Sequence, residues 1–360
     1  MANTITNRQM VFILIVTLMS ISVITMPKVM AEQAGVGNWI PIMITAVVFG
    51  ILVTFLAKLN RAFPGMALYD YSRELVGKTG CCIIAVFYVL YFLKASVYMS
   101  SHMAEMLRAN FLFETPYWAF LLAGIPVFGY LAYQGPVITA RIFELYGVVG
   151  LAVLIITHTN MMIQGDVNNI LPFIVPSEIG RSLGAVKEAV IAFLGIEVLT
   201  VMPFSKKNKR APWIAFLVLL AIGVIYVVVV ESSIMMVGLD EIKYYEYPLF
   251  SAIRQIELEK IEFLKRLDVL YLTAGLMSVF AVVAVLYLAA VEYTVKLLPR
   301  VKRLVIVIGV GIAIFVGSII GPGIDNFNEI ITQYTSYTGL IAAGFIPIGL
   351  WVIAKVKKRA

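Results

Sequence analysis

Apolar residues in this chain gather in long blocks that short polar stretches separate. Because the blocks are continuous and do not alternate with polar residues, an outer-membrane β-barrel is excluded. A helix that crosses a bilayer needs about 20 mostly apolar residues. The pattern therefore predicts an all-α membrane protein with ten transmembrane helices. These predicted spans are residues 10–33, 39–59, 81–107, 116–133, 138–163, 183–204, 212–237, 268–294, 304–321 and 332–354.

The composition supports the same class of protein. The chain has 360 residues, of which 61% are hydrophobic and 14% are charged, whereas soluble domains carry about 25% charged residues. So few charges cannot cover a water-facing surface, and most of the exterior must face hydrocarbon. No soluble domain fits between the spans, so we expect residues 1–360 to form a single transmembrane domain.

The net charge of +7 comes largely from short basic clusters outside the spans, such as residues 206–210 and 355–359. Basic loops tend to stay on the cytoplasmic side of a membrane, and this bias places both termini in the cytoplasm. No basic face with interleaved aromatic residues lies outside the spans, so no nucleic-acid partner is expected. The lipid bilayer is the expected environment.

Two spans contain residues that interrupt a membrane helix. In the first span, the run from Ser20 to Lys28 includes Pro27, and in the sixth span Gly195 and Glu197 lie well inside the segment. An unwound turn exposes backbone N–H and C=O groups, which persist at membrane depth only beside protein, water or a ligand. We therefore expect helices 1 and 6 to be interrupted at residues 20–28 and 193–197.

The first and sixth spans hold matching positions if the chain consists of two five-helix repeats, residues 1–163 and 181–360. Because five is odd, the second repeat enters from the opposite face, which gives the five-plus-five inverted repeat of many secondary transporters. Half-helix N-termini at the breaks favour a carboxylate, and exposed carbonyls favour an ammonium, so an amino acid fits both. The alternative is that Pro27 kinks an ordinary helix and Gly195 is a packing contact.

The third span carries a polar stripe. Its members recur at helical spacing and fall within a sector of roughly 80°. An unpaired cation at mid-span is costly, so the lysine should face the interior and a carboxylate such as Glu197. The alternative is that these residues are packing and headgroup contacts. The stripe consists of Tyr91, Lys94, Tyr98, His102 and Glu105.

Enzyme signatures are absent from the sequence. His102 and His158 lie on different spans, and no cysteine and histidine cluster has zinc spacing. No phosphate-binding glycine loop occurs. We therefore expect no catalytic residue, no metal site, no cofactor and no enzymatic activity.

The segment between the seventh and eighth spans, residues 238–266, includes apolar residues that alternate with charged ones. This pattern is typical of an amphipathic helix that lies on the outer surface of the membrane. The helix could close over a cavity as a lid or rest on lipid, and both interpretations stay open.

The loop after the second span resembles a known family. Residues 63–80 contain Pro64-Gly65, the pair Tyr71-Ser72, then Val76-Gly77-Lys78 and Gly80. This segment is similar to the corresponding part of B subunits of spore germinant receptors, where a leucine or isoleucine is common at the position of Val76. The resemblance extends along nearly the whole chain, to Pro27, Ala140-Arg141, Leu171-Pro172, Phe193, Glu197 and Pro203.

The resemblance implies a ten-span protein of the spore inner membrane that binds a small nutrient, typically an amino acid, and triggers germination. It also implies an A subunit and a lipid-modified C subunit as partners. B subunits are similar in turn to transporters of the amino acid-polyamine-organocation superfamily, whose LeuT-like fold has the inverted repeat. This chain departs from those transporters because Ser20, Ser22 and Thr25 stand where glycines are common, and its fifth span has no lysine.

The predicted site combines residues from four spans. Glu197 and the first break should bind the ammonium of the ligand, while Lys94 or Glu105 should hold water or a proton path. Two other functions remain open, a proton-coupled amino-acid transporter and a membrane scaffold with a vestigial pocket. The predicted substrate-binding residues are Thr25, Met26, Tyr98, His102, Phe193, Gly195, Glu197 and Tyr287.

Overall fold

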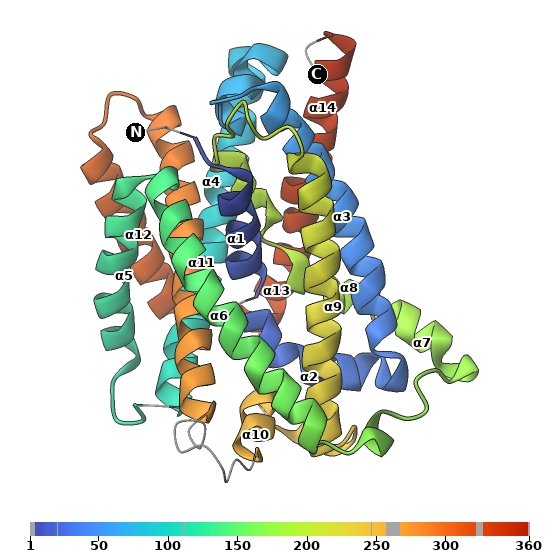
Figure 1. Cartoon of the computed structure of the whole chain (residues 1–360). Helices are drawn as coiled ribbons and strands as arrows, with labels where there is room; N and C mark the ends of the chain where they lie inside the picture. The colour runs from blue at the N-terminus through green and yellow to red at the C-terminus, as the bar shows by residue number, and fades with distance from the viewer. Residues whose placement is uncertain are drawn as a thin grey trace.

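The computed structural model describes residues 4–19, 21–110, 112–245, 247–256, 267–321 and 327–358. Within these ranges the secondary structure is helical apart from one isolated β-bridge between Ile5 and Phe204 (Figure 1). Seven helices are long and apolar enough to cross a membrane, or eight if one bent pair counts as a single span. The predicted all-α membrane class is confirmed, and the count of ten spans stays a prediction.

Most helix bounds follow the apolar blocks to within a few residues. The fifth of the predicted spans, for example, is the uninterrupted helix α6, and the seventh is α9. The α-helices are α1 (Asn7–Leu18), α2 (Ile21–Gln33), α3 (Trp39–Ala62), α4 (Leu68–Asn110), α5 (Tyr117–Gln134), α6 (Pro136–Gln164), α7 (Ile179–Gly184), α8 (Val186–Phe193), α9 (Ala211–Val237), α10 (Pro248–Arg254), α11 (Leu267–Leu297), α12 (Arg303–Ile320), α13 (Phe327–Leu340) and α14 (Ile346–Val356).

The first predicted span consists of two helices with a bend of 57° between them. Helix α1 ends at Leu18, and Met19 leaves helical geometry with φ −83° and ψ 56°. Helix α2 then contains Pro27 in its interior. The bend therefore lies just ahead of the expected run of residues 20–28, most of which is helical.

The loop that carries the family resemblance is partly helical. Gly65 adopts φ +78° and its N–H donates to the carbonyl of Phe204 at 2.9 Å, which ties the Pro-Gly turn to the end of the sixth predicted span. Helix α4 then starts at Leu68, well before the predicted span begins. Gly77 breaks its geometry with φ +76° and ψ −178°, a conformation that glycine adopts without a Cβ penalty.

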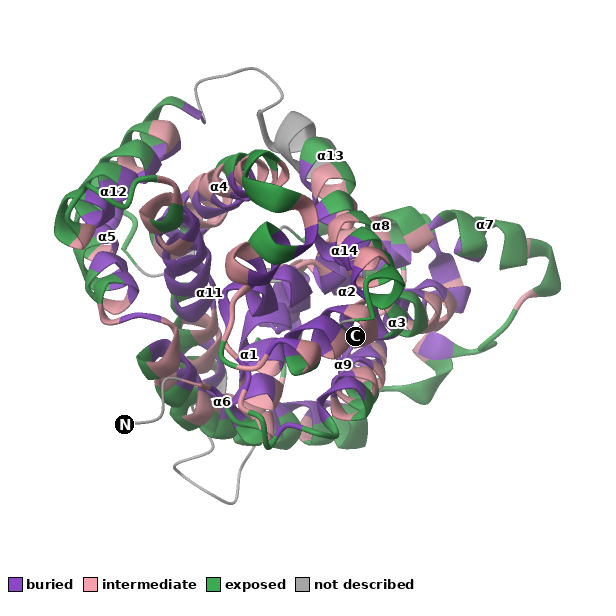
Figure 2. Ribbon diagram, turned by 90° about the horizontal axis from the view of Figure 1, so that it is seen from above, coloured by how far each residue is buried: buried purple, intermediate pink, exposed green. Residues whose placement is uncertain are grey.

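The core of the bundle is formed by α3 packed along α9 and α4 packed along α11, with α1 at the centre. Buried residues line the facing sides of the helices, and exposed residues cover the outside (Figure 2). Large apolar side chains such as Ile83 and Leu90 are more than 60% exposed on α4. Such an apolar exterior suits contact with lipid.

Only part of the predicted surface helix at residues 238–266 can be compared with the structure. The short helix α10 lies within it and buries Leu249, Phe250 and Ile253. It packs against α2 and α9. Residues 257–266 lie outside the described residues, so the lid remains a prediction.

Candidate functional site

The sixth predicted span leaves α-helical geometry at Leu194 and Gly195. Helix α8 ends at Phe193, Leu194 is extended, and Gly195 has φ +131° before a 3-10 helix at Ile196–Val201. A Cβ atom on Gly195 would lie 2.8 Å from Cγ2 of Thr17 on α1. Glycine is therefore required here both by backbone geometry and by the close approach of α1.

Glu197 lies directly after this break and is 1% exposed. Its Oε1 accepts a hydrogen bond from the Tyr91 hydroxyl at 2.6 Å, and its Oε2 accepts one from the Gly195 N–H at 2.8 Å. Among the residues that the structure describes, it forms no ion pair with a lysine or arginine. A carboxylate has about four acceptor positions, so Glu197 retains capacity for a further donor.

Tyr226 on α9 joins the two irregular regions. Its hydroxyl is within hydrogen-bond distance of the Leu18 carbonyl at the end of α1 and lies 2.9 Å from the Ala192 carbonyl near the end of α8. Phe193 packs against the Tyr226 ring at 5.2 Å and the Phe49 ring at 5.9 Å. Tyr226 thereby offers a donor inside the bundle to carbonyls at the ends of α1 and α8, which lack an intrahelical partner.

A cavity opens between these elements, with a volume of about 480 Å3 that includes the part open to solvent. The hydroxyls of Thr17 and Thr335 are buried and have no hydrogen-bond partner among the residues that the structure describes. Buried polar groups without a partner are uncommon and call for an explanation such as an absent ligand or water. The lining residues are Thr17, Tyr91, Ala95, Tyr98, Met99, Ile191, Leu194, Gly195, Glu197, Val282, Leu286 and Thr335.

Two other hollows are of similar or greater size. One of about 500 Å3 lies between α1, α2, α6 and α11, and one of about 1180 Å3 lies between α5 and α12. Neither is lined by a charged side chain. Of these three hollows, the cavity beside Glu197 alone combines a carboxylate, unpartnered hydroxyls and an irregular backbone in its lining. Over the described part of the chain, no three His, Cys, Asp or Glu side chains gather to hold a metal ion.

Three of the predicted site residues, Tyr98, Gly195 and Glu197, line the cavity beside Glu197. Phe193 is not a lining residue and packs instead against the rings of Tyr226 and Phe49. Thr25 and Met26 belong to α2, beyond the bend, and are not among the lining residues. The first break contributes Thr17 instead.

The remaining predicted residues lie elsewhere. His102 packs edge-on against Tyr98 at 4.4 Å, and its Nδ1 lies 3.9 Å from Oε2 of Glu105. Neither His102 nor Glu105 lines the cavity. Tyr287 donates to the carbonyl of Val307 at 2.6 Å and lines the hollow between α5 and α12.

Lys94 does not pair with Glu197 as the sequence predicts. Its Nζ donates to the Thr338 hydroxyl at 2.7 Å and lies 5.8 Å from the centre of the Tyr91 ring. Tyr91 takes the place beside the carboxylate, and the lysine extends toward α13. The cation is therefore held by a hydroxyl and an aromatic ring.

Three polar residues of the cavity lining were not predicted as ligand contacts, namely Thr17, Tyr91 and Thr335. Tyr91 stood on the polar stripe of the third span, but helical spacing alone does not show which partner a side chain meets. Thr17 is a single hydroxyl in an apolar run. A cluster of polar residues at 332–338 was the signal that could have identified Thr335.

Comparison with known proteins places this chain in a family. The model of the family described as "Spore germination protein" matches residues 4–321. Spore germination protein YndE of Bacillus subtilis (strain 168) is 27% identical over 362 residues, covering 99% of this chain and 97% of the relative. Spore germination protein A2 of the same organism is 24% identical, covering 95% of this chain and 93% of the relative.

The fold also matches a solved structure, the crystal structure of MhsT in complex with L-phenylalanine. The TM-score is 0.62 at 14% sequence identity, and the match covers 98% of this chain and 89% of MhsT. This likeness shows a LeuT-type transporter fold, and the matched family is not one of enzymes. The chain therefore belongs to the spore germination protein family, as an integral membrane protein with a transporter-type fold.

Proposed function

We propose that this chain is the nutrient-sensing subunit of a spore germinant receptor and that it binds an amino acid in the cavity beside Glu197. The observation that carries the proposal is the convergence of Glu197 with the unpartnered hydroxyls of Thr17 and Thr335 at an irregular backbone. The shared fold supports it, because MhsT is described with a bound amino acid.

The cavity offers complementary groups for each part of an amino acid. The carboxylate of Glu197 accepts from the ligand's ammonium. The hydroxyls of Thr17 and Thr335 supply further hydrogen bonds. The apolar lining, which includes Met99 and Leu286, receives an apolar ligand side chain.

Signalling would follow from a shift between two packings of the bundle. A ligand held between Thr17 and Glu197 favours the packing in which α1 and α8 are close together. Tyr226, which contacts the carbonyls of Leu18 and Ala192, connects that shift to α9. The change then passes to an A subunit and a lipid-modified C subunit at the spore inner membrane, with both termini of this chain in the cytoplasm.

The unpartnered hydroxyls provide a test of ligand binding. Thr17→Val and Thr335→Val should leave the thermal stability of the empty protein unchanged or slightly higher, because no intramolecular hydrogen bond is lost. Each should weaken the stabilisation by an amino acid, by about 1 kcal/mol of binding free energy per hydrogen bond. The measurement is the melting temperature of purified protein over a panel of amino acids.

Thr45→Val is the matched control, because the buried Thr45 hydroxyl donates to the Pro41 carbonyl at 2.7 Å outside the cavity. It should lower the stability of the empty protein without changing the ligand-induced shift. Wild-type protein that no amino acid stabilises, even far above physiological concentration, would instead favour a scaffold with a vestigial pocket.

The second candidate function is proton-coupled amino-acid transport, which the transporter-type fold favours. Protein reconstituted into vesicles with an imposed pH gradient separates the two functions. A sensor should bind labelled amino acid without accumulating it. Saturable uptake that collapses when the gradient is abolished would support transport through Glu197 or Glu105.

A further inference from the structure

A large groove runs between α5 and α12 on the outside of the bundle. The two helices lie side by side at the edge of the molecule, away from α3 and α9 (Figures 1 and 2). The groove measures about 1180 Å3 including its open side, and apolar residues dominate its lining. Its rim residues Leu122, Ile308 and Ile312 are each more than 50% exposed, so the groove opens to the lipid.

The floor of the groove is narrow, because α5 and α12 each place a glycine against the Tyr287 hydroxyl. The Tyr287 hydroxyl lies between two glycines, and a Cβ atom would lie 3.1 Å from it on Gly129 and 2.5 Å from it on Gly311. Tyr287 lines the groove while being 2% exposed. A transmembrane helix, about 10–12 Å across with its side chains, cannot enter such a slot to its floor, whereas a methylene chain can.

The length of the groove matches one leaflet of a bilayer. Its lining extends from Leu122 to Tyr133 on α5 and from Leu304 to Phe315 on α12. At 1.5 Å per residue each run spans about 17 Å. Half of a hydrocarbon core is about 15 Å thick, so a single extended acyl chain fills the groove from end to end.

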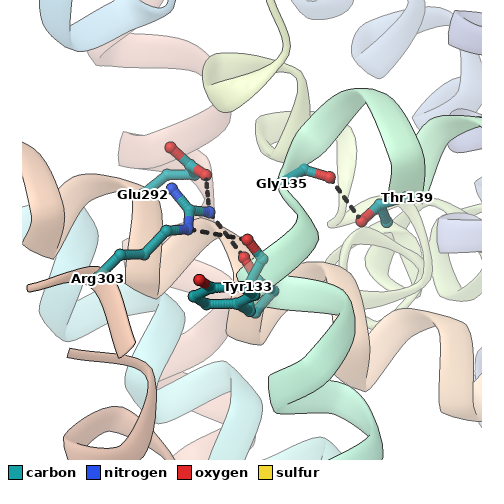
Figure 3. A network of polar contacts seen from close by, with 6 residues as sticks. Tyr133, Gly135, Thr139, Glu292 and Arg303 are labelled. Carbon is teal, nitrogen blue, oxygen red and sulfur yellow. Dashed lines mark hydrogen bonds and ion pairs between the residues drawn. The ribbon is translucent and has the colours of Figure 1, made fainter. Parts of the chain in front are cut away.

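Cationic residues stand at one end of the groove. Figure 3 shows Arg303, at the start of α12, bonded to Glu292 and to backbone carbonyls at the end of α5. Its contacts include the Ala132 carbonyl at 2.7 Å and the Tyr133 carbonyl at 3.1 Å. Arg303 thus holds the two walls together and its charge is neutralised by Glu292. Arg300 and Lys302 are exposed beside it.

We propose that the groove between α5 and α12 binds an anionic phospholipid, with one acyl chain against Tyr287 and the phosphate over Arg300 and Lys302. The acyl chain explains the narrow apolar slot, and the phosphate explains the cations at its end. Each cation at a membrane surface strengthens the binding of an anionic lipid by about fivefold. The lipid would form part of the wall of the bundle next to α11.

Native mass spectrometry of the purified full chain tests this proposal, using phosphatidylglycerol and phosphatidylcholine with the same acyl chains. The wild type should retain one phosphatidylglycerol in preference to phosphatidylcholine. Replacing both cations, Arg300→Gln with Lys302→Gln, should reduce that preference about 25-fold, or about fivefold per cation. Lys206→Gln with Lys207→Gln makes the same charge change in another exposed loop and should leave the preference intact.

A second variant tests the groove itself. Ile312→Trp fills the slot and should reduce the retention of both lipids, whereas Ile319→Trp, on α12 outside the groove lining, should not. Equal retention of both lipids by the wild type, or unchanged preference in the Arg300 and Lys302 variant, overturns the proposal. A wild-type dimer that Ile312→Trp converts to monomer also overturns it, because a second copy would then occupy the groove.

Discussion

Glu197→Gln is expected to reduce the affinity for an amino acid germinant by at least about thirtyfold, since removing one partner of a buried charge pair costs about 2–5 kcal/mol. The glutamine carbonyl can still accept from the Gly195 N–H, and its amide can donate to the Tyr91 hydroxyl oxygen. The local network therefore survives and the change removes chiefly the negative charge. Titration of labelled amino acid onto purified protein measures the loss.

Glu231→Gln is the matched control, because Glu231 is a carboxylate on α9 that is 8% exposed and does not line the cavity. It should bind the germinant as the wild type does. In spores, Glu197→Gln should abolish the response to nutrient at a normal receptor level. A normal response from such spores would count against Glu197 as a ligand contact.

Gly195→Ala is expected to destabilise the empty protein strongly. A non-glycine residue at φ +131° is strained by about 1–3 kcal/mol, and the new Cβ atom at 2.8 Å from Thr17 Cγ2 adds an overpacking cost of about 1–3 kcal/mol. Together these approach a large fraction of the net stability of a typical domain, about 5–15 kcal/mol. The measurement is the melting temperature of the purified variant.

The two contributions can be separated by a second substitution. Thr17→Ser removes the methyl group that the new Cβ would meet, so the double variant should recover the steric part of the loss and keep the backbone part. Gly309→Ala is the control, because a Cβ atom there meets nothing within 4 Å on α12. A Gly195→Ala protein as stable as Gly309→Ala would show that the break is not built as described.

Much of the fold followed from the sequence because membrane helices are coded by continuous apolar runs. The blocks at 138–163 and 212–237 correspond to α6 and α9 within a few residues. The position of the first bend did not follow, because Pro27 marks where a helix can kink while the surrounding packing decides where it does. Helix α4 likewise breaks at Gly77, where the backbone has a positive φ. The presence of a glycine in the sequence does not by itself reveal such a break.

The sequence indicated the residue at the centre of the candidate site but not the residues around it. Glu197 was identifiable because a carboxylate inside an apolar block is costly unless it has a role. The partner of that carboxylate was assigned to Lys94 by charge, whereas the structure places the Tyr91 hydroxyl there. Helical spacing shows on which face of a helix a residue lies, but packing sets its distance to another helix. The sequence therefore could not show that Tyr287 and His102 do not line this cavity.

The central claim is that an amino acid binds between the end of α1 and the break at Gly195. A structure of the protein solved with the amino acid that raises its melting temperature most tests this directly. The account predicts ligand density in the cavity, with the ammonium within hydrogen-bond distance of Glu197 and the Thr17 hydroxyl in contact. Ligand density in the hollow between α6 and α11, or an empty cavity at saturating ligand, would contradict it.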